Sequence, residues 1–385
     1  MRIAWFRPTP PESSNPLDDI GGVIEALRAS HAIDIFDASR AHDFVWMQAR
    51  HAYDLCVYEL DNTLGHQFIW PYLLHFPGVL ALRTTTLHDS RVAALVREQR
   101  YEDYAEEMAF SGAPRPLRVS RRYLPRGTWP MLRAPLLSSR LAVVNDAGLV
   151  ESLQRNYAGA RVRYAPAGIS RIRSVVAASP RGDSRPVTFG LVDLTRAAVA
   201  ERAVRRARAM GAPVELRAET DVPRVLQEAD VILALHWPSF GEPETAALLS
   251  MAASKPLIVA ETYATAAWPA VDPQTWRPRG FASSEPPIVV SIDPRDEEHS
   301  LMLAMRRLAS DASLRSELGR AAHAWWETHA TVAHAVRAWS EILDEAALLE
   351  PPVRPTDWPP HLSADGTERA RAMLHDLGAS VDFLQ

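Results

Sequence analysis

The stretch of the sequence with the clearest chemical potential runs from His236 to Glu261 (HWPSFGEPETAALLSMAASKPLIVAE). An apolar run ends before it, a polar Gly-Glu loop follows, and the next apolar residues predict a helix that begins near Pro243 or Thr245. The start of such a helix exposes unpaired N–H groups and the positive end of its dipole, which together bind phosphate groups. Glu242 and Glu244 can accept hydrogen bonds from hydroxyl groups, or they are ordinary first-turn acids that stabilise the helix.

The motifs of several large enzyme classes are missing from the chain. It contains no P-loop, no GxGxxG after a strand, no HExxH and no GxSxG. Kinases, classical dehydrogenases, zinc proteases and serine hydrolases of those types are therefore disfavoured. The remaining guide to a functional site is the position of polar residues relative to the predicted strands.

Composition narrows the class of protein further. A formal net charge of −5 argues against a protein whose main partner is nucleic acid. Cys56 is the only cysteine, so an intrachain disulfide and a thiolate metal cluster are both excluded. With no signal peptide at the start and no long apolar run, we expect a cytoplasmic protein, with contact to the inner face of the membrane left open.

Strands and helices alternate along the whole chain. Apolar runs at 2–6, 32–36, 53–60, 78–83 and 141–145 predict strands, and helical spacing lies between them, including one long helical stretch from Ser90 to Phe110. The runs at 187–192, 214–219, 230–235 and 256–261 repeat this alternation. Such alternation predicts an α/β fold with parallel, doubly wound sheets, which bind ligands at the carboxyl ends of the strands.

The length and the loops predict how the chain is divided. At 385 residues it is too long for one ordinary core, and an Arg-, Ser-, Gly- and Pro-rich stretch separates two α/β halves. We predict an N-terminal Rossmann-like domain at 1–168, a linker at 169–186, a C-terminal Rossmann-like domain at 187–328, and helices and a tail at 329–385 that pack back on the first domain. The arginine-rich segment 112–135 is a surface loop or faces the acceptor.

Three segments give the chain a resemblance to a known family. The segments are RIAWFRPTPPESSNPLDDIGGVIEAL, YDLCVYELDNTLGHQFIWPYLLHFPGVLAL and the stretch from His236 to Glu261. Together they resemble retaining GT-B glycosyltransferases of family 4, and the likeness covers most of the first 345 residues. The resemblance implies two Rossmann-like domains facing across a cleft, with a nucleotide-sugar donor on the C-terminal side and a hydroxyl acceptor (a glycan, a lipid-linked glycan or a small molecule) on the N-terminal side.

The resemblance also implies site residues. Its donor-binding set is Asn15, Arg196, Arg202, Gly241, Glu242, Glu244 and Thr245, and its catalytic set is His88, Arg196 and Glu242. An arginine can stabilise the charge of a departing diphosphate without a metal, and we predict no metal and no cofactor. Arg196, Arg202 and His88 also have a structural alternative. Arg202 and the arginines near it can simply form a solvated helix face, and for Arg196 this alternative and phosphate binding are about equally favoured. His88 can instead cap a helix or pack in the interior.

Four positions depart from the family pattern. Asn15 stands where a glycine is usual, Arg83 where many relatives have histidine, Leu249 where the second of two glutamates is expected, and Ser254 where glycine is common. These departures motivate an alternative, a GT-B-shaped protein without transferase activity that binds or assembles with an active enzyme.

Overall fold

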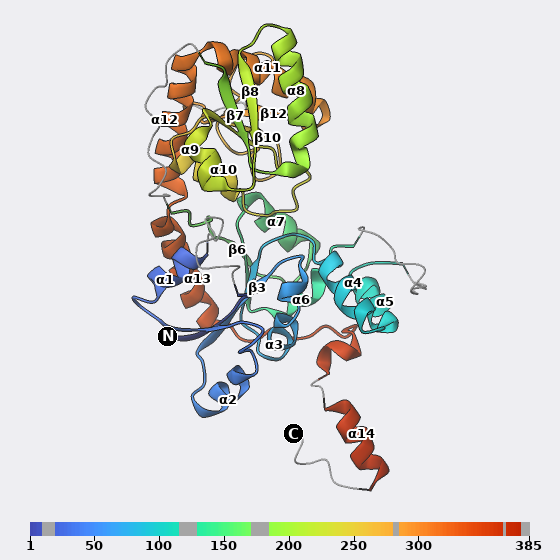
Figure 1. Cartoon of the computed structure of the whole chain (residues 1–385). Helices are drawn as coiled ribbons and strands as arrows, with labels where there is room; N and C mark the ends of the chain where they lie inside the picture. The colour runs from blue at the N-terminus through green and yellow to red at the C-terminus, as the bar shows by residue number, and fades with distance from the viewer. Residues whose placement is uncertain (10–19, 115–128, 171–184, 280–284, 365–366, 379–385) are drawn as a thin grey trace.

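Two α/β lobes follow one another in the computed structural model (Figure 1), which describes residues 1–9, 20–114, 129–170, 185–279, 285–364 and 367–378. The first lobe contains a six-stranded parallel sheet of order β2-β1-β3-β4-β5-β6. Its strands are β1 (Arg2–Phe6), β2 (Ala32–Phe36), β3 (Leu55–Leu60), β4 (Val79–Leu82), β5 (Leu141–Val144) and β6 (Val162–Tyr164). Every residue of β3, β4 and β5 is buried, as expected for parallel strands with helices on both faces.

The helices of the first lobe lie between these strands in the chain. They are α1 (Gly21–Leu27), α2 (Asp43–Arg50), the short 3₁₀ turn η1 (Leu64–His66), α3 (Ile69–His75), α4 (His88–Arg97), α5 (Tyr101–Phe110), α6 (Arg133–Ser138) and α7 (Ala147–Asn156). The single helix predicted from Ser90 to Phe110 is wrong, because the chain breaks into α4 and α5 at Gln99, whose φ of 58° is left-handed.

The second lobe contains another six-stranded parallel sheet, of order β11-β12-β10-β9-β7-β8. Its strands are β7 (Val187–Leu191), β8 (Val214–Ala218), β9 (Val231–Ala234), β10 (Leu257–Ala260), β11 (Ala270–Val271) and β12 (Val289–Ile292). Its helices are η2 (Leu194–Arg196), α8 (Ala197–Ala209), α9 (Val222–Glu228), α10 (Thr245–Ala252), η3 (Pro294–Asp296), α11 (Glu297–Ser310) and α12 (Ala312–His329). The predicted α/β fold with two parallel sheets is confirmed.

The chain returns to the first lobe after α12. Helix α13 (Val332–Leu348) packs against α1, and the ring of Trp339 lies 5.2 Å from that of Trp5 on β1. Beyond it, Arg354 donates to the carbonyl of Leu74 at 2.7 Å. The remaining elements are η4 (Pro360–Ser363) and α14 (Glu368–Asp376). None of the described helices is long and apolar enough to cross a lipid bilayer.

The two lobes meet through the loops that follow β4 and β9. Thr85 Oγ1 donates to the carbonyl of Phe240 at 2.7 Å, and the backbone N–H of Thr85 donates to the same oxygen. Next to it, Gly241 has a φ of +84°, and a Cβ there would lie 2.7 Å from the side chain of Leu149 on α7. Only glycine tolerates both the conformation and the close approach. Because parallel strands end at one edge of a sheet, these contacts bring carboxyl-end loops of the two sheets together.

Candidate active site

Two neighbouring cavities lie where these loops meet. One, of about 290 Å³, is lined by the ends of β7 and β9, by His236 and by Glu242 to Ala246 at the start of α10. The other, of about 360 Å³, has walls from both lobes, including Asn145 to Gly148 at the start of α7. Glu242, Pro243 and Glu244 line both. The loop that sequence reasoning singled out therefore borders both cavities.

His236 is the cationic group of the smaller cavity. Its Nδ1 lies 3.4 Å from Asp193 Oδ2, and its Nε2 lies 3.4 Å from Glu242 Oε2. The hydrogen bond with Glu242, with help from nearby carboxylates, raises the pKa of His236 to about 9 despite its burial. A histidine with that pKa is protonated at neutral pH, so it can stabilise an anion. Glu242 is held in place by the backbone N–H of Phe240 at 2.6 Å.

Glu244 stands between the two cavities at the N-cap of α10. Only 9% of it is exposed, and its Oε1 has no hydrogen-bond partner among the described residues. Burial raises the pKa of this carboxyl to about 7. Thr245 begins α10, and its hydroxyl donates to the carbonyl of Pro243 at 3.3 Å. The predicted helix start near Pro243 or Thr245 thus lies on the cavity wall.

The two predicted donor arginines are engaged by glutamates. Arg196, in η2 after β7, makes a two-pronged ion pair with Glu297 at the start of α11, with Nε 2.9 Å from Oε1. Arg202 Nε lies 2.8 Å from Glu298 Oε2 at an exposed position. Arg196 follows the strand next to the one that His236 follows, so both come from the same edge of the sheet. Its guanidinium, however, is turned to Glu297 in this structure.

The first-lobe residues singled out in the sequence are His88, Arg83 and Asn15. His88 begins α4, is 3% exposed, and lies 2.8 Å from the hydroxyl of Tyr104 through Nε2. Burial lowers the pKa of His88. These contacts correspond to the packing alternative. Arg83 donates from Nη1 at 2.9 Å to Oδ1 of Asn145, and Asn145 lines the larger cavity. Asn15 lies outside the described residues.

The structure shows the surroundings of Leu249 and Ser254, the two second-lobe positions that depart from the family pattern. Leu249 is 2% exposed and packs in the core on α10, and it lines neither cleft cavity. Ser254 adopts a φ of 57°, the left-handed conformation in which glycine is common. The backbone shape associated with glycine is thus kept although the residue is not.

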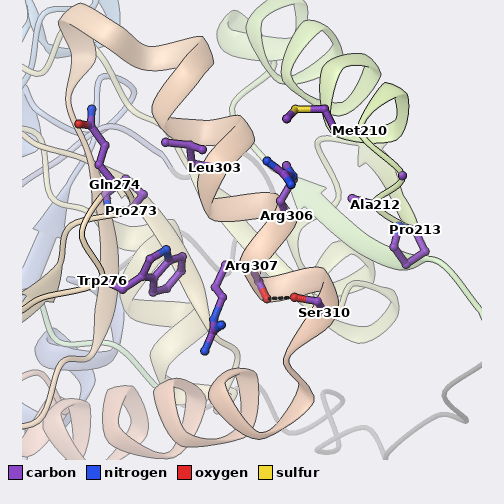
Figure 2. Close-up of a pocket in the computed structure, with 11 residues that line it drawn as sticks. Met210, Ala212, Pro213, Pro273, Gln274, Trp276, Leu303, Arg306, Arg307 and Ser310 are labelled. Atoms are coloured by element: carbon purple, nitrogen blue, oxygen red, sulfur yellow. Dashed lines mark hydrogen bonds between the residues drawn. The ribbon is translucent and has the colours of Figure 1, made fainter.

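A third cavity, of about 420 Å³, lies at the opposite edge of the second sheet. Its wall includes Pro213, just before β8, and Trp276, Arg306 and Arg307 (Figure 2). It shares no lining residue with the two cleft cavities. Ligands of doubly wound sheets bind at the carboxyl ends of strands, so the cleft, rather than this cavity, is the candidate site.

Sequence reasoning gave no role to His236, Asp193 or Asp146, although all three border the cleft cavities. Each comes within two residues of the end of a predicted buried strand. That position was the available signal, because polar residues there project toward the ligand edge of a parallel sheet.

Comparison with known proteins identifies the fold. No protein-family model matches the chain, and no curated protein matches its sequence. Among solved structures, Anabaena HepE in complex with UDP and glucose has a TM-score of 0.54 at 12% identity, covering 90% of this chain and 100% of that one. HepE in complex with UDP-glucose gives a TM-score of 0.52 at 10% identity, with the same coverage. The two parallel sheets and this similarity confirm the predicted GT-B fold.

Proposed function

We propose that this chain is a glycosyltransferase that moves a sugar from a nucleotide-sugar donor to a hydroxyl group of an acceptor, with retention of configuration. The observation that supports it best is the pairing of a protonated His236 with the start of α10 at the carboxyl edge of the second sheet. HepE, which shares the fold, was solved with UDP-glucose. A family 4-like enzyme acting in the cytoplasm on a hexosyl donor is the finer form of this proposal.

In this proposal the donor's diphosphate lies in the smaller cavity. The first N–H groups of α10 and His236 face the negative charge that develops as the nucleoside diphosphate leaves. Glu242 accepts hydrogen bonds from sugar or ribose hydroxyls, and its contact with Phe240 N fixes the carboxylate for this role. Glu244 and Thr245 complete the wall of this cavity, whereas Gly241, just before the loop, is not among its lining residues.

Arg196 takes part only if a phosphate group displaces Glu297 from its guanidinium. A phosphate is a stronger partner than a carboxylate for an arginine fork, and the ion pair is already oriented. Arg202 lies on α8, the helix that follows η2, and pairs with Glu298. We therefore assign the larger share of diphosphate stabilisation to His236 and a smaller one to these arginines.

A donor screen read by released nucleotide tests the proposal. Native protein is compared with His236→Gln and Arg196→Ala, and with Arg205→Ala as a control at a 65% exposed position on α8. Removing one group that stabilises developing negative charge costs roughly 10²- to 10³-fold in rate. His236→Gln should lose that much, Arg196→Ala less, and the control nothing. Equal rates for His236→Gln and native protein contradict the site assignment.

Two further properties follow from the same proposal. The charge of the leaving group is offset by protein groups, so transfer should be unchanged when EDTA removes divalent metal ions. Retention places the new bond in the anomeric configuration of the donor, which NMR of the product measures directly.

One observation favours the alternative of a binding or assembly partner without transferase activity. Arg196 and Arg202 are both paired with glutamates. Titration of nucleoside diphosphates by calorimetry separates the two functions. A transferase binds at least one of them, whereas the absence of any binding at millimolar concentration supports the partner role.

A further inference from the structure

The larger cleft cavity has the dimensions of a small-molecule site. Its volume is about 360 Å³, which falls in the range of ordinary ligand pockets. The first lobe contributes the start of α7 and the residues after β6, and the second lobe contributes the loop from Glu242 to Glu244 and the segment from Tyr263 to Pro269. Glu242 and Glu244 also line the smaller cavity. A molecule in the larger cavity therefore lies next to the proposed donor position.

Two buried carboxylate oxygens, one from each lobe, have no hydrogen-bond partner among the residues that the structure describes. They are Oδ2 of Asp146 and Oε1 of Glu244. Asp146 is 7% exposed and Glu244 is 9% exposed, so both residues are more than nine-tenths buried. The other oxygen of Asp146 caps α7 by accepting from the N–H of Gly148 at 2.8 Å. Burying a carboxylate oxygen without a partner is unfavourable, and a ligand that donates to both oxygens removes that cost.

Aromatic rings form another part of the wall. The rings of Trp268 and Trp325 lie 5.6 Å apart, and the ring of Trp325 stacks on that of His329 at 4.6 Å. Tyr263, on the same wall, is 84% exposed. The described residues that line the cavity include no lysine and no arginine. Carboxylates beside aromatic faces are the surroundings that suit an organic cation.

We propose that this cavity binds the protonated amino group of an amine-bearing sugar or small molecule, held between Asp146 and Glu244 with its carbon skeleton against Trp268 and Tyr263. An ammonium group donates three hydrogen bonds, and it neutralises charge that a neutral hydroxyl cannot. The assignment of this molecule as the acceptor rests on the proposed transferase function, because the cavity adjoins the proposed donor position. Binding of the amine itself does not depend on transfer.

Calorimetric titration without any donor tests the site. The probe is glucosamine, and glucose and N-acetylglucosamine are the neutral counterparts of similar shape. Glucosamine should bind native protein at least tenfold more tightly than either neutral sugar. Glu244→Gln should reduce glucosamine affinity to that of glucose, whereas the same change at Glu151, an 81% exposed residue of α7, should leave it unaltered.

A second variant guards against a folding defect. Because Tyr263 is exposed, Tyr263→Ala should fold normally and weaken all three sugars several-fold by removing the aromatic surface. Equal affinities for glucosamine and glucose overturn the proposal, as does undiminished glucosamine binding by Glu244→Gln. Titration of Mg²⁺ and Mn²⁺ covers the other cations that carboxylates bind, and binding of a divalent ion that displaces glucosamine from native protein also overturns it.

The outcomes separate this site from the transferase function. Glucosamine binding without any released nucleotide keeps the cation site and rejects the transferase. Transfer to neutral acceptors without selective glucosamine binding keeps the transferase and rejects the cation site.

Discussion

Replacing Glu244 by glutamine should make the protein more stable, and only at neutral to alkaline pH. Burial holds the pKa of Glu244 at about 7, against 4.5 for an ordinary glutamate. The folded state therefore binds a proton that the unfolded state has released between pH 4.5 and 7, and stability falls as pH rises through that window. Since one pKa unit corresponds to about 1.4 kcal/mol, the ionised carboxylate costs about 3 kcal/mol above pH 7. Glutamine keeps the shape and removes the charge.

Urea unfolding at pH 8 and pH 5 measures this cost. The free energy of unfolding of Glu244→Gln should exceed that of native protein by about 3 kcal/mol at pH 8 and by less than about 1 kcal/mol at pH 5. Glu151→Gln, the same change at an exposed site, should match native protein at both pH values. If the stabilisation at pH 8 is absent, or equal to that at pH 5, burial does not raise the pKa of Glu244 as the structure indicates.

Three other variants probe neighbouring features. The pKa of His236 is raised to about 9, so its ion pairs stabilise the fold below pH 6.5, and this contribution is lost as pH rises through 9. Because the His236 side chain is 42% exposed, solvent screens these ion pairs. In urea unfolding, His236→Gln should therefore lower the free energy of unfolding by about 1 kcal/mol at pH 6 and leave it unchanged above pH 10. Ser254→Gly should raise the melting temperature. Relief of the left-handed φ of 57° stabilises the folded state by roughly 1–2 kcal/mol, and the greater conformational entropy that glycine loses on folding cancels about half of this gain. Gly319→Ala should lower it by an amount equivalent to roughly 1–3 kcal/mol, because a Cβ on α12 would collide with the carbonyl of Ser254. A melting temperature of Gly319→Ala equal to that of native protein would mean that α12 does not pack this closely on the loop.

The fold was predictable because its determinants are local. Continuous apolar runs such as LCVYEL in β3 and LAVV in β5 belong to strands buried on both faces, and the helical spacing between them forces parallel pairing. The order of strands within each sheet was not predicted, since it depends on contacts between residues far apart in the chain. The break at Gln99 was missed for a similar reason, because Ser90 to Phe110 has helical composition throughout and the left-handed residue carries no glycine or proline signal.

Side-chain partners in the cleft were harder to predict than side-chain positions. The sequence places Arg196 within five residues of the end of β7, but its partner Glu297 is 101 residues away. His88 likewise follows β4 as expected, yet its direction is decided by Tyr104 on α5, a helix that the sequence did not separate from α4. In each case the position after a strand could be read from the sequence, and a distant neighbour determined where the polar atoms point.

The charges of the cleft connect the two proposed binding events. Asp193, Glu242, Glu244 and Asp146 all border the cavities, and His236 is a cation that contacts Asp193 and Glu242. A diphosphate entering the smaller cavity meets unfavourable carboxylate charge on the wall that it shares with the larger one. An ammonium group between Asp146 and Glu244 offsets that charge close to the donor, so each ligand should favour the other's binding. In this proposal the cost that Glu244 imposes on the empty protein is offset when both ligands are bound, so a buried carboxylate at this position favours the doubly occupied state.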